Sequence, residues 1–271
     1  MSFDFKNEFL PISSKNSMHY KKIARVARGK FPELVALEGF RLCETALEAG
    51  FRPQAIVYSS ELLNETQTRR FSQWREWLNG TFKTSPIRLD LSADLMKRLC
   101  ATVRPQGVFM LVDRPRADFK PETPLNRGLL IVENIQDPGN MGALIRVADA
   151  FGLDGFFYTS DAADPWQDKA VRASMGSVFH IDIFRGESVL EICEILAARQ
   201  IPVLAAALDG ENLRQIRVDG PLAVVLGNEG SGLTWQTLDA VNRKITIEMP
   251  GRAESLNVAV AAGICCFHLF T

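Results

Sequence analysis

The second half of the chain alternates short apolar runs with amphipathic stretches. Consecutive apolar residues at 129–132, 156–158, 203–207 and 222–226 have the length expected of strands that are buried on both faces. Apolar residues recur at helical spacing at 142–151, 187–199 and 235–241. This alternation predicts an α/β domain with a mostly parallel sheet, whose ligand crevice lies at the carboxyl ends of the strands.

The first half predicts a smaller α/β unit. A helical pattern over 38–49 ends before Gly50, which is a typical C-cap, and a further helix is expected at 92–99, with strands at 55–58 and 107–112. The segment 113–127 holds three prolines and seven charged residues, a composition typical of an interdomain linker. We therefore expect one domain over 1–116, a linker over 117–127, and a second domain over 128–271.

Charge is distributed unevenly over the 271 residues, although the whole chain carries a net charge of only −1. Residues 1–116 contain 19 Lys and Arg against 12 Asp and Glu, a net charge of +7. Residues 117–271 contain 12 against 20, a net charge of −8. The basic half suggests contact with a polyanion, although charge alone leaves open a solvated surface with chance clustering.

The sequence favours a cytoplasmic protein that binds neither membrane nor metal. Residues 1–11 lack the basic and apolar regions of a secretory signal, and the longest apolar run, 258–267, is about half the length of a bilayer-spanning helix. With 46% hydrophobic and 23% charged residues the composition is globular. The five cysteines are scattered, form no C-x-x-C pair, and are expected to be buried apolar residues.

Three glycine-containing segments follow predicted strands and are candidate binding loops. They have the sequences ENIQDPGNMGALIR at 133–146, LGNEGSGL at 226–233 and IEMPGRAESLNV at 247–258. Glycine lets the backbone approach a ligand closely. Neither the G-x-G-x-x-G nor the P-loop pattern is present, which disfavours a dinucleotide dehydrogenase or a P-loop enzyme. No G-x-S-x-G element occurs, so a serine hydrolase is also disfavoured.

The order and spacing of these segments resemble the three motifs of the TrmH/SpoU branch of the SPOUT methyltransferases. The matching patterns are N-x-G-x-x-x-R at 140–146, L-G-N-E-G-x-G-L at 226–233 and S-L-N-V-A-V-A at 255–261. The stretch DPWQDKAVRASMG at 164–176 is similar to the family's sequence between its first two motifs. The resemblance implies a trefoil-knotted catalytic domain with helices on both faces of the sheet, a homodimer, and methylation of an RNA ribose 2′-hydroxyl with S-adenosyl-L-methionine.

The first half resembles the ribosomal-protein-like RNA-binding domain that precedes many of these catalytic domains. The similarity rests on a basic helix within 12–28, on Glu38 and Gly39 before the next helix, and on the sequence PQG at 105–107. It implies RNA contacts from Lys21, Lys22 and Arg25.

Within the second domain, the resemblance also implies roles for particular residues. The expected cofactor-binding residues are Gly227, Glu229, Ile247, Met249 and Leu256. Glu229 could also hold the knot loops together by accepting hydrogen bonds from backbone N–H groups. Arg146 is the family's catalytic arginine; because arginine stays protonated, we expect it to hold a phosphate and to stabilise the 2′-oxygen as it loses its proton. Asn140, Ser255 and Asn257 are the other expected catalytic residues. Asn140 could also cap the following helix, and Ser255 and Asn257 could either orient Arg146 or the ribose, or cap a helix. Arg172 and Ser174 could contact the phosphate of the substrate RNA.

Several points stay open at the level of sequence. Glu248 stands where the family commonly has proline, which affects the expected cofactor contacts. The substrate could be ribosomal RNA, which the added basic domain favours by analogy, or transfer RNA. A non-catalytic RNA-binding protein with the same fold is a further alternative, although the motif residues are intact. The segment from 256 onward is apolar on too many faces for a lone surface helix, so we expect it in a dimer interface.

Overall fold

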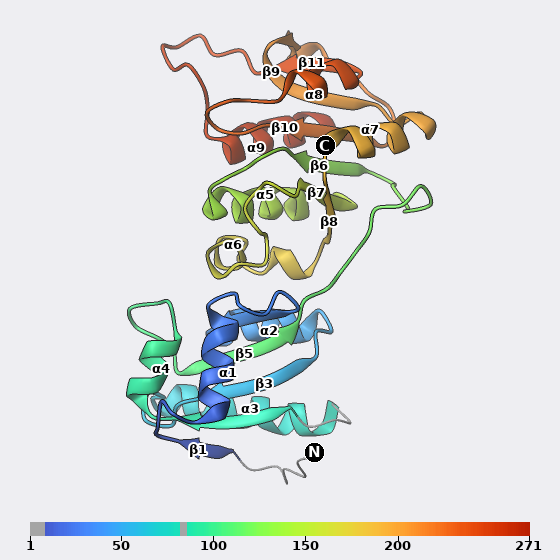
Figure 1. Ribbon diagram of the computed structural model, residues 1–271. Helices are drawn as coiled ribbons and strands as arrows, with labels where there is room; N and C mark the ends of the chain where they lie inside the picture. The colour runs from blue at the N-terminus through green and yellow to red at the C-terminus, as the bar shows by residue number, and fades with distance from the viewer. Residues whose placement is uncertain (1–8, 82–85) are drawn as a thin grey trace. The chain divides into compact units, whose positions relative to one another are not determined.

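The computed structural model describes residues 9–81 and 86–271 (Figure 1). Residues 1–8, which belong to the segment used above to judge export, lie outside the described residues. The chain divides into two compact units, Met1–Pro115 and Arg116–Thr271. Each unit has its own sheet and its own core, and each is described by itself.

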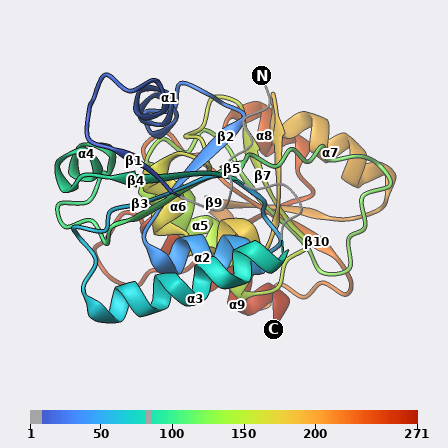
Figure 2. The same ribbon diagram turned by 90° about the horizontal axis from the view of Figure 1, so that it is seen from below.

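The first unit is a five-stranded mixed sheet with helices on both faces. Its strand order is β1-β4-β3-β5-β2, in which β5 is antiparallel to β2 and β3, and β4 is parallel to β1 and β3. Figure 2 shows α1 and α4 on one face and α2 and α3 on the other. The elements are β1 (Leu10–Ile12), α1 (Met18–Ala27), β2 (Leu34–Glu38), α2 (Phe40–Glu48), β3 (Pro53–Tyr58), α3 (Glu65–Thr81), β4 (Ile87–Leu91), α4 (Ala93–Leu99) and β5 (Val108–Asp113).

One predicted helix start in this unit shifts for a local reason. The residues expected to open the helix at 38 instead end strand β2, and α2 begins only at Phe40. Between them Gly39 adopts a φ of +88°, which glycine adopts without steric penalty. Strands β1, β2 and β4 and helix α3 were not predicted. Helix α3 carries mostly polar residues along its length, so it lacks an apolar helical pattern.

The second unit is a six-stranded sheet in the order β11-β9-β10-β6-β7-β8, with every described strand pair parallel. The predicted α/β class with a mostly parallel sheet is therefore confirmed. The elements are β6 (Gly128–Val132), α5 (Pro138–Ala150), β7 (Gly155–Thr159), α6 (Asp168–Ala173), η1 (Ser177–Phe179), β8 (Asp182–Gly186), α7 (Val189–Ala198), β9 (Val203–Asn212), η2 (Leu213–Gln215), β10 (Leu222–Leu226), α8 (Trp235–Ala240), β11 (Arg243–Thr246) and α9 (Val258–Phe270).

Helices cover both faces of this sheet, which explains why its central strands are apolar throughout. Every residue of β6, β7 and β10 is buried. On one face, alternate strand residues such as Leu129 and Val225 pack with Ile192 and Leu196 of α7. On the other face, α5 and α9 lie side by side (Figure 1). The three motif loops follow the carboxyl ends of β6, β10 and β11.

The segment 117–127, predicted as a linker, packs on the second unit. Ala117 pairs with Phe184 of β8, and the ring of Phe119 lies 5.2 Å from the ring of Phe184 in an edge arrangement. The Asp154 carboxylate accepts the backbone N–H groups of residues 126, 127 and 128 at 2.7 to 2.9 Å. These contacts explain why a proline-rich segment is held along the sheet edge.

The cysteines of the second unit pack as apolar side chains. Burial raises the pKa of Cys265 and of Cys266 to about 12, so both thiols stay protonated at neutral pH. Burial likewise raises the pKa of Cys193 to about 11. Within residues 9–81 and 86–271, none of the helices combines the length and the apolar character needed to cross a bilayer.

Candidate functional site

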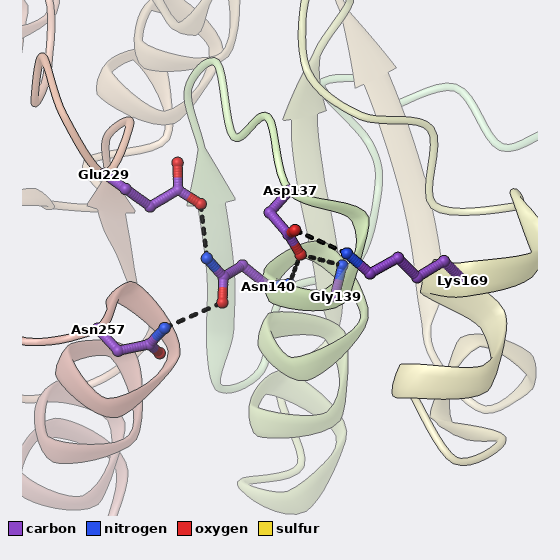
Figure 3. Close-up of polar contacts among 6 residues, drawn as sticks. All are labelled: Asp137, Gly139, Asn140, Lys169, Glu229 and Asn257. Carbon is purple, nitrogen blue, oxygen red and sulfur yellow. Dashed lines mark hydrogen bonds and ion pairs between the residues drawn. The ribbon is translucent and has the colours of Figure 1, made fainter.

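The first motif forms the start of helix α5, where Asp137 is the N-cap. The Asp137 Oδ1 atom accepts the backbone N–H groups of Gly139 at 2.5 Å and Asn140 at 3.0 Å (Figure 3). Asn140 therefore lies inside the first turn, and the expectation that it caps the helix is wrong. Lys169 Nζ donates to Asp137 Oδ2 at 2.7 Å, and this hydrogen bond lowers the pKa of Asp137.

Gly142 explains the glycine of the N-x-G pattern. A Cβ atom at this position would lie 2.2 Å from the carbonyl oxygen of Ala170 and 2.7 Å from the Cβ atom of Ala173. The backbone of α6 therefore packs directly on α5. Arg172 of α6 forms an ion pair with Asp168, and Ser174 is fully buried with its hydroxyl donating to the carbonyl of Val171. This burial gives Ser174 a structural role in place of the predicted phosphate contact.

All three motifs meet at the side chain of Asn140. Its Nδ2 atom donates to Glu229 Oε1 at 2.7 Å, and its Oδ1 atom accepts from Asn257 Nδ2 at 3.0 Å (Figure 3). We call Asn140, Glu229 and Asn257 the polar cluster. The expectation that Glu229 accepts backbone N–H bonds is corrected by this contact, because its observed donor is a side-chain amide.

Asn257 has a second task, as the N-cap of helix α9. Its Oδ1 atom accepts the backbone N–H groups of Ala259 at 2.9 Å and Val260 at 3.4 Å. With the oxygen occupied in this way, the Nδ2 group points to Asn140. The Asn257 amide therefore caps α9 and also contacts Asn140, so the two roles expected as alternatives are both present.

Arg146 lies further along α5 and is exposed to solvent. Among the described residues it has no hydrogen-bond or ion-pair partner, so neither Ser255 nor Asn257 orients it in this structure. An exposed guanidinium on the helix that begins at the polar cluster is available for an anionic ligand.

Two residues missed at the level of sequence hold the motif loops in place. Glu133, directly after β6, is 7% exposed, and its carboxylate accepts from Thr234 N at 2.8 Å, Thr234 Oγ1 at 3.0 Å and Thr237 Oγ1 at 2.7 Å. Asn228 donates from Nδ2 to the carbonyl of Asn134 at 2.8 Å. The Asn228 bond connects the second motif to the first, and the Glu133 bonds connect the first motif to the two threonines that follow the second. A carboxylate immediately after an all-apolar strand was the signal that could have identified Glu133.

A cavity of about 340 Å³ lies beside the polar cluster. Of the predicted cofactor residues, Ile247, Met249 and Leu256 line it, and so does Ser255, whereas Gly227 and Glu229 do not. Gly227 packs against a residue that lines the cavity. A Cβ atom at Gly227 would lie 2.4 Å from the backbone of Gly232, so the absence of a side chain lets the two backbones approach closely. A mainly apolar pocket of this size fits the flat adenine of an adenosyl cofactor.

The predicted RNA-binding residues of the first unit share the exposed side of α1. Lys21, Lys22 and Arg25 are all exposed, whereas Ile23 and Ala24 face the core. The helix therefore presents positive charge to solvent along one side, as contact with phosphate groups requires.

Comparison with known proteins agrees with this geometry. Residues 128–267 match the model of the SpoU rRNA Methylase family, and residues 16–110 match the MRM3-like substrate binding domain. The chain belongs to the SpoU rRNA methylase family. The predicted TrmH/SpoU resemblance and the preceding substrate-binding domain are thereby confirmed.

Two relatives of this SpoU family member are named as 23S rRNA 2′-O-methyltransferases. It is 34% identical over 86% of its length to the 23S rRNA (guanosine(2553)-2′-O)-methyltransferase RlmP of Bacillus subtilis, covering 87% of that protein. It is 30% identical over 83% of its length to the 23S rRNA (uridine(2479)-2′-O)-methyltransferase of Streptomyces viridochromogenes, covering 78% of that protein. A crystal structure of an AdoMet-bound rRNA methyltransferase from Sinorhizobium meliloti superposes with a TM-score of 0.83 at 25% identity, covering 96% of this chain and 97% of that one.

Proposed function

We propose that this protein methylates a ribose 2′-hydroxyl of 23S ribosomal RNA, with S-adenosyl-L-methionine as the methyl donor. One observation carries the proposal: Ser255 and Leu256 line the cavity, and the next residue, Asn257, bonds the amide of Asn140. A cofactor site and a polar site are thus joined within three consecutive residues. The names of the two relatives favour ribosomal over transfer RNA as the substrate class.

Glu229, Arg146 and the cavity walls have different roles in the proposed reaction. Glu229 accepts from Asn140 Nδ2 and so fixes which end of that amide faces Asn257. A guanidinium group has five N–H donors and no acceptor, so the role of Arg146 is to hold the phosphate beside the target ribose and to stabilise the 2′-oxygen as its proton leaves. The cofactor supplies an electrophilic methyl group, and the apolar cavity walls keep the site dry and aligned.

The proposal is tested by two measurements. Titration calorimetry should detect binding of S-adenosylmethionine and of its demethylated product, and no binding of NAD. Mapping of ribose methylation in 23S rRNA should find one position that is unmodified in cells lacking the protein and restored by the purified enzyme. If those cells keep the same set of methylated ribose positions in 23S rRNA as wild-type cells, the proposed substrate is contradicted.

We further propose a knotted homodimer that is paired through α9. Val260, Ile264 and Phe267 are 51%, 39% and 65% exposed, and their spacing places them on one side of that helix. An apolar stripe of this kind is typical of an interface. Light scattering should give a dimeric mass at micromolar concentration, and Phe267→Glu should shift it toward the monomer. A monomeric wild-type protein would contradict this proposal.

We assign RNA binding mainly to the first unit, with Lys21, Lys22 and Arg25 as phosphate contacts. Arg172, on α6 of the second unit, is assigned as a further contact to the RNA. An rRNA substrate would place the enzyme in the cytoplasm. Replacing the three α1 residues by alanine should weaken RNA binding at low salt and leave cofactor affinity unchanged, because phosphate contacts supply much of the non-specific affinity.

A further inference from the structure

Strand β9 continues past the sheet core and ends beside the cavity. Its pairing with β11 shifts register between Lys244, which pairs with Ala205, and Ile245, which pairs with Glu211, so residues 206–210 of β9 lie between the two paired stretches. Gly210 permits this excursion, because a Cβ atom there would lie 2.5 Å from the backbone of Ile245. The preceding residue, Asp209, is thereby placed on the cavity wall.

Asp209 differs in character from the rest of that wall. Of the described residues that line the cavity, it carries the only charged side chain. Lys244 Nζ donates to Asp209 Oδ2 at 2.5 Å, and this hydrogen bond lowers the pKa of Asp209. The Asp209 side chain is 69% exposed, so its carboxylate, which can accept several hydrogen bonds, remains open to a ligand.

We propose that Asp209, paired with Lys244, binds the ribose 2′,3′-diol of the adenosyl cofactor. This inference rests on the proposed function. It specifies that the ribose of the cofactor lies at the edge of the cavity formed by Asp209. The sequence pattern gave no sign of it, because the residues at 208–210 lie beyond the apolar run that predicted the strand.

The charge of the pair decides which part of the cofactor it can hold. The sulfonium or the α-ammonium group would meet the Lys244 ammonium, and the cofactor's carboxylate would meet Asp209. A neutral diol can donate hydrogen bonds to the carboxylate and accept one from the ammonium at once. The apolar remainder of the wall, including Ile247 and Leu256, is left for the adenine.

The neighbouring ion pair provides a matched control. Glu211 bonds Arg243 across the same two strands, with Arg243 Nε to Glu211 Oε1 at 3.0 Å, but neither residue lines the cavity. Asp209→Asn and Glu211→Gln therefore remove equivalent surface charges from β9, and only the first removes a cavity group.

Calorimetry with S-adenosylhomocysteine and its 2′-deoxy and 3′-deoxy analogues tests the inference without measuring activity. Asp209→Asn should weaken S-adenosylhomocysteine binding about tenfold, since hydrogen bonds to charged groups contribute on this scale. Glu211→Gln should bind within twofold of wild type. Loss of a ribose hydroxyl should weaken binding to wild type, and should weaken binding to the Asp209→Asn protein far less.

Three results would overturn the assignment. The first is unchanged S-adenosylhomocysteine affinity in Asp209→Asn. The second is an equal loss of affinity in wild type and in Asp209→Asn when S-adenosylhomocysteine is replaced by its deoxy analogues. The third is a loss for S-adenosylmethionine much larger than for S-adenosylhomocysteine, which would mean that Asp209 faces the sulfonium. A wild-type protein that binds neither ligand would overturn the proposed function itself, and this inference with it.

Discussion

The cavity and the polar cluster are neighbours built on different principles. The cavity is walled mainly by apolar side chains at the ends of β9 and β11 and in the segment before α9. The polar cluster consists of three exposed or half-buried side chains, held by hydrogen bonds of 2.7 and 3.0 Å at the starts of α5 and α9. The first region suits tight holding of a cofactor, and the second suits orientation of a polar substrate.

This difference implies that cofactor affinity and methyl-transfer rate can be perturbed separately. The covalent connection between Leu256, which lines the cavity, and Asn257, which bonds Asn140, is the shortest link between the two regions. Substitutions in the cavity should therefore change cofactor affinity, and substitutions in the polar cluster should change the methyl-transfer rate. Substitution of a residue that holds both regions in place should change both quantities.

The largest expected effect is that of Arg146→Ala. Arg146 is exposed and does not line the cavity, so S-adenosylmethionine affinity should stay nearly unchanged. The single-turnover methylation rate should fall by at least about a hundredfold, roughly 3 kcal/mol, the scale seen when one preorganised oxyanion donor is removed.

The Arg146→Lys variant sharpens this test. It keeps the positive charge but loses the planar fork that grips phosphate, so it should restore little of the rate. An alanine variant that methylates RNA at the wild-type rate would remove Arg146 from the chemistry. A variant with much weaker cofactor binding would instead contradict the separation of the two regions.

Glu133→Ala should affect both regions, because Glu133 joins the end of β6 to the start of α8. Its buried carboxylate accepts three hydrogen bonds from Thr234 and Thr237, and its loss leaves these donors without their acceptor. The free energy of unfolding in urea should fall by about 2 kcal/mol, with weaker cofactor binding. Glu133→Gln, which keeps one acceptor oxygen, should lose less; equal stability of Glu133→Ala and wild type would refute this role.

The sequence predicted the central strands and the motif positions but not the contacts between motifs. Strands β6, β7 and β10 are buried on both faces and produce continuous apolar runs, which are easily recognised. The edge strands β8 and β11 are partly exposed and carry charged residues, so no apolar run marked them.

The same limit applies to the site residues. Motif spacing identified Asn140 and Asn257, and three of the five predicted cofactor residues do line the cavity. The bond between the two asparagines joins residues 117 positions apart and depends on how α5 and α9 pack. Likewise, Asp209 lines the cavity from residues 206–210 of β9, which lie between its two stretches of pairing with β11, and no local pattern encodes this register shift.

The smallest expected effect, and the finest test of the link between the regions, comes from Asn257. Asn257→Asp keeps an acceptor for the N–H groups of Ala259 and Val260 at the start of α9, where negative charge is favourable, so stability should be unchanged. Asn257→Ala removes the cap and should lower the free energy of unfolding by about 1 kcal/mol.

Both Asn257 variants lose the Nδ2 donor to Asn140, so both should methylate more slowly by about tenfold, roughly 1.4 kcal/mol. S-adenosylhomocysteine affinity should stay within about twofold, because Asn257 does not line the cavity. Comparing the two variants separates capping from site geometry, since only the alanine variant should lose stability while both lose rate. An aspartate variant with the full wild-type rate would show that the Asn257–Asn140 bond serves only the fold, and that the polar cluster acts through Asn140 and Glu229 alone.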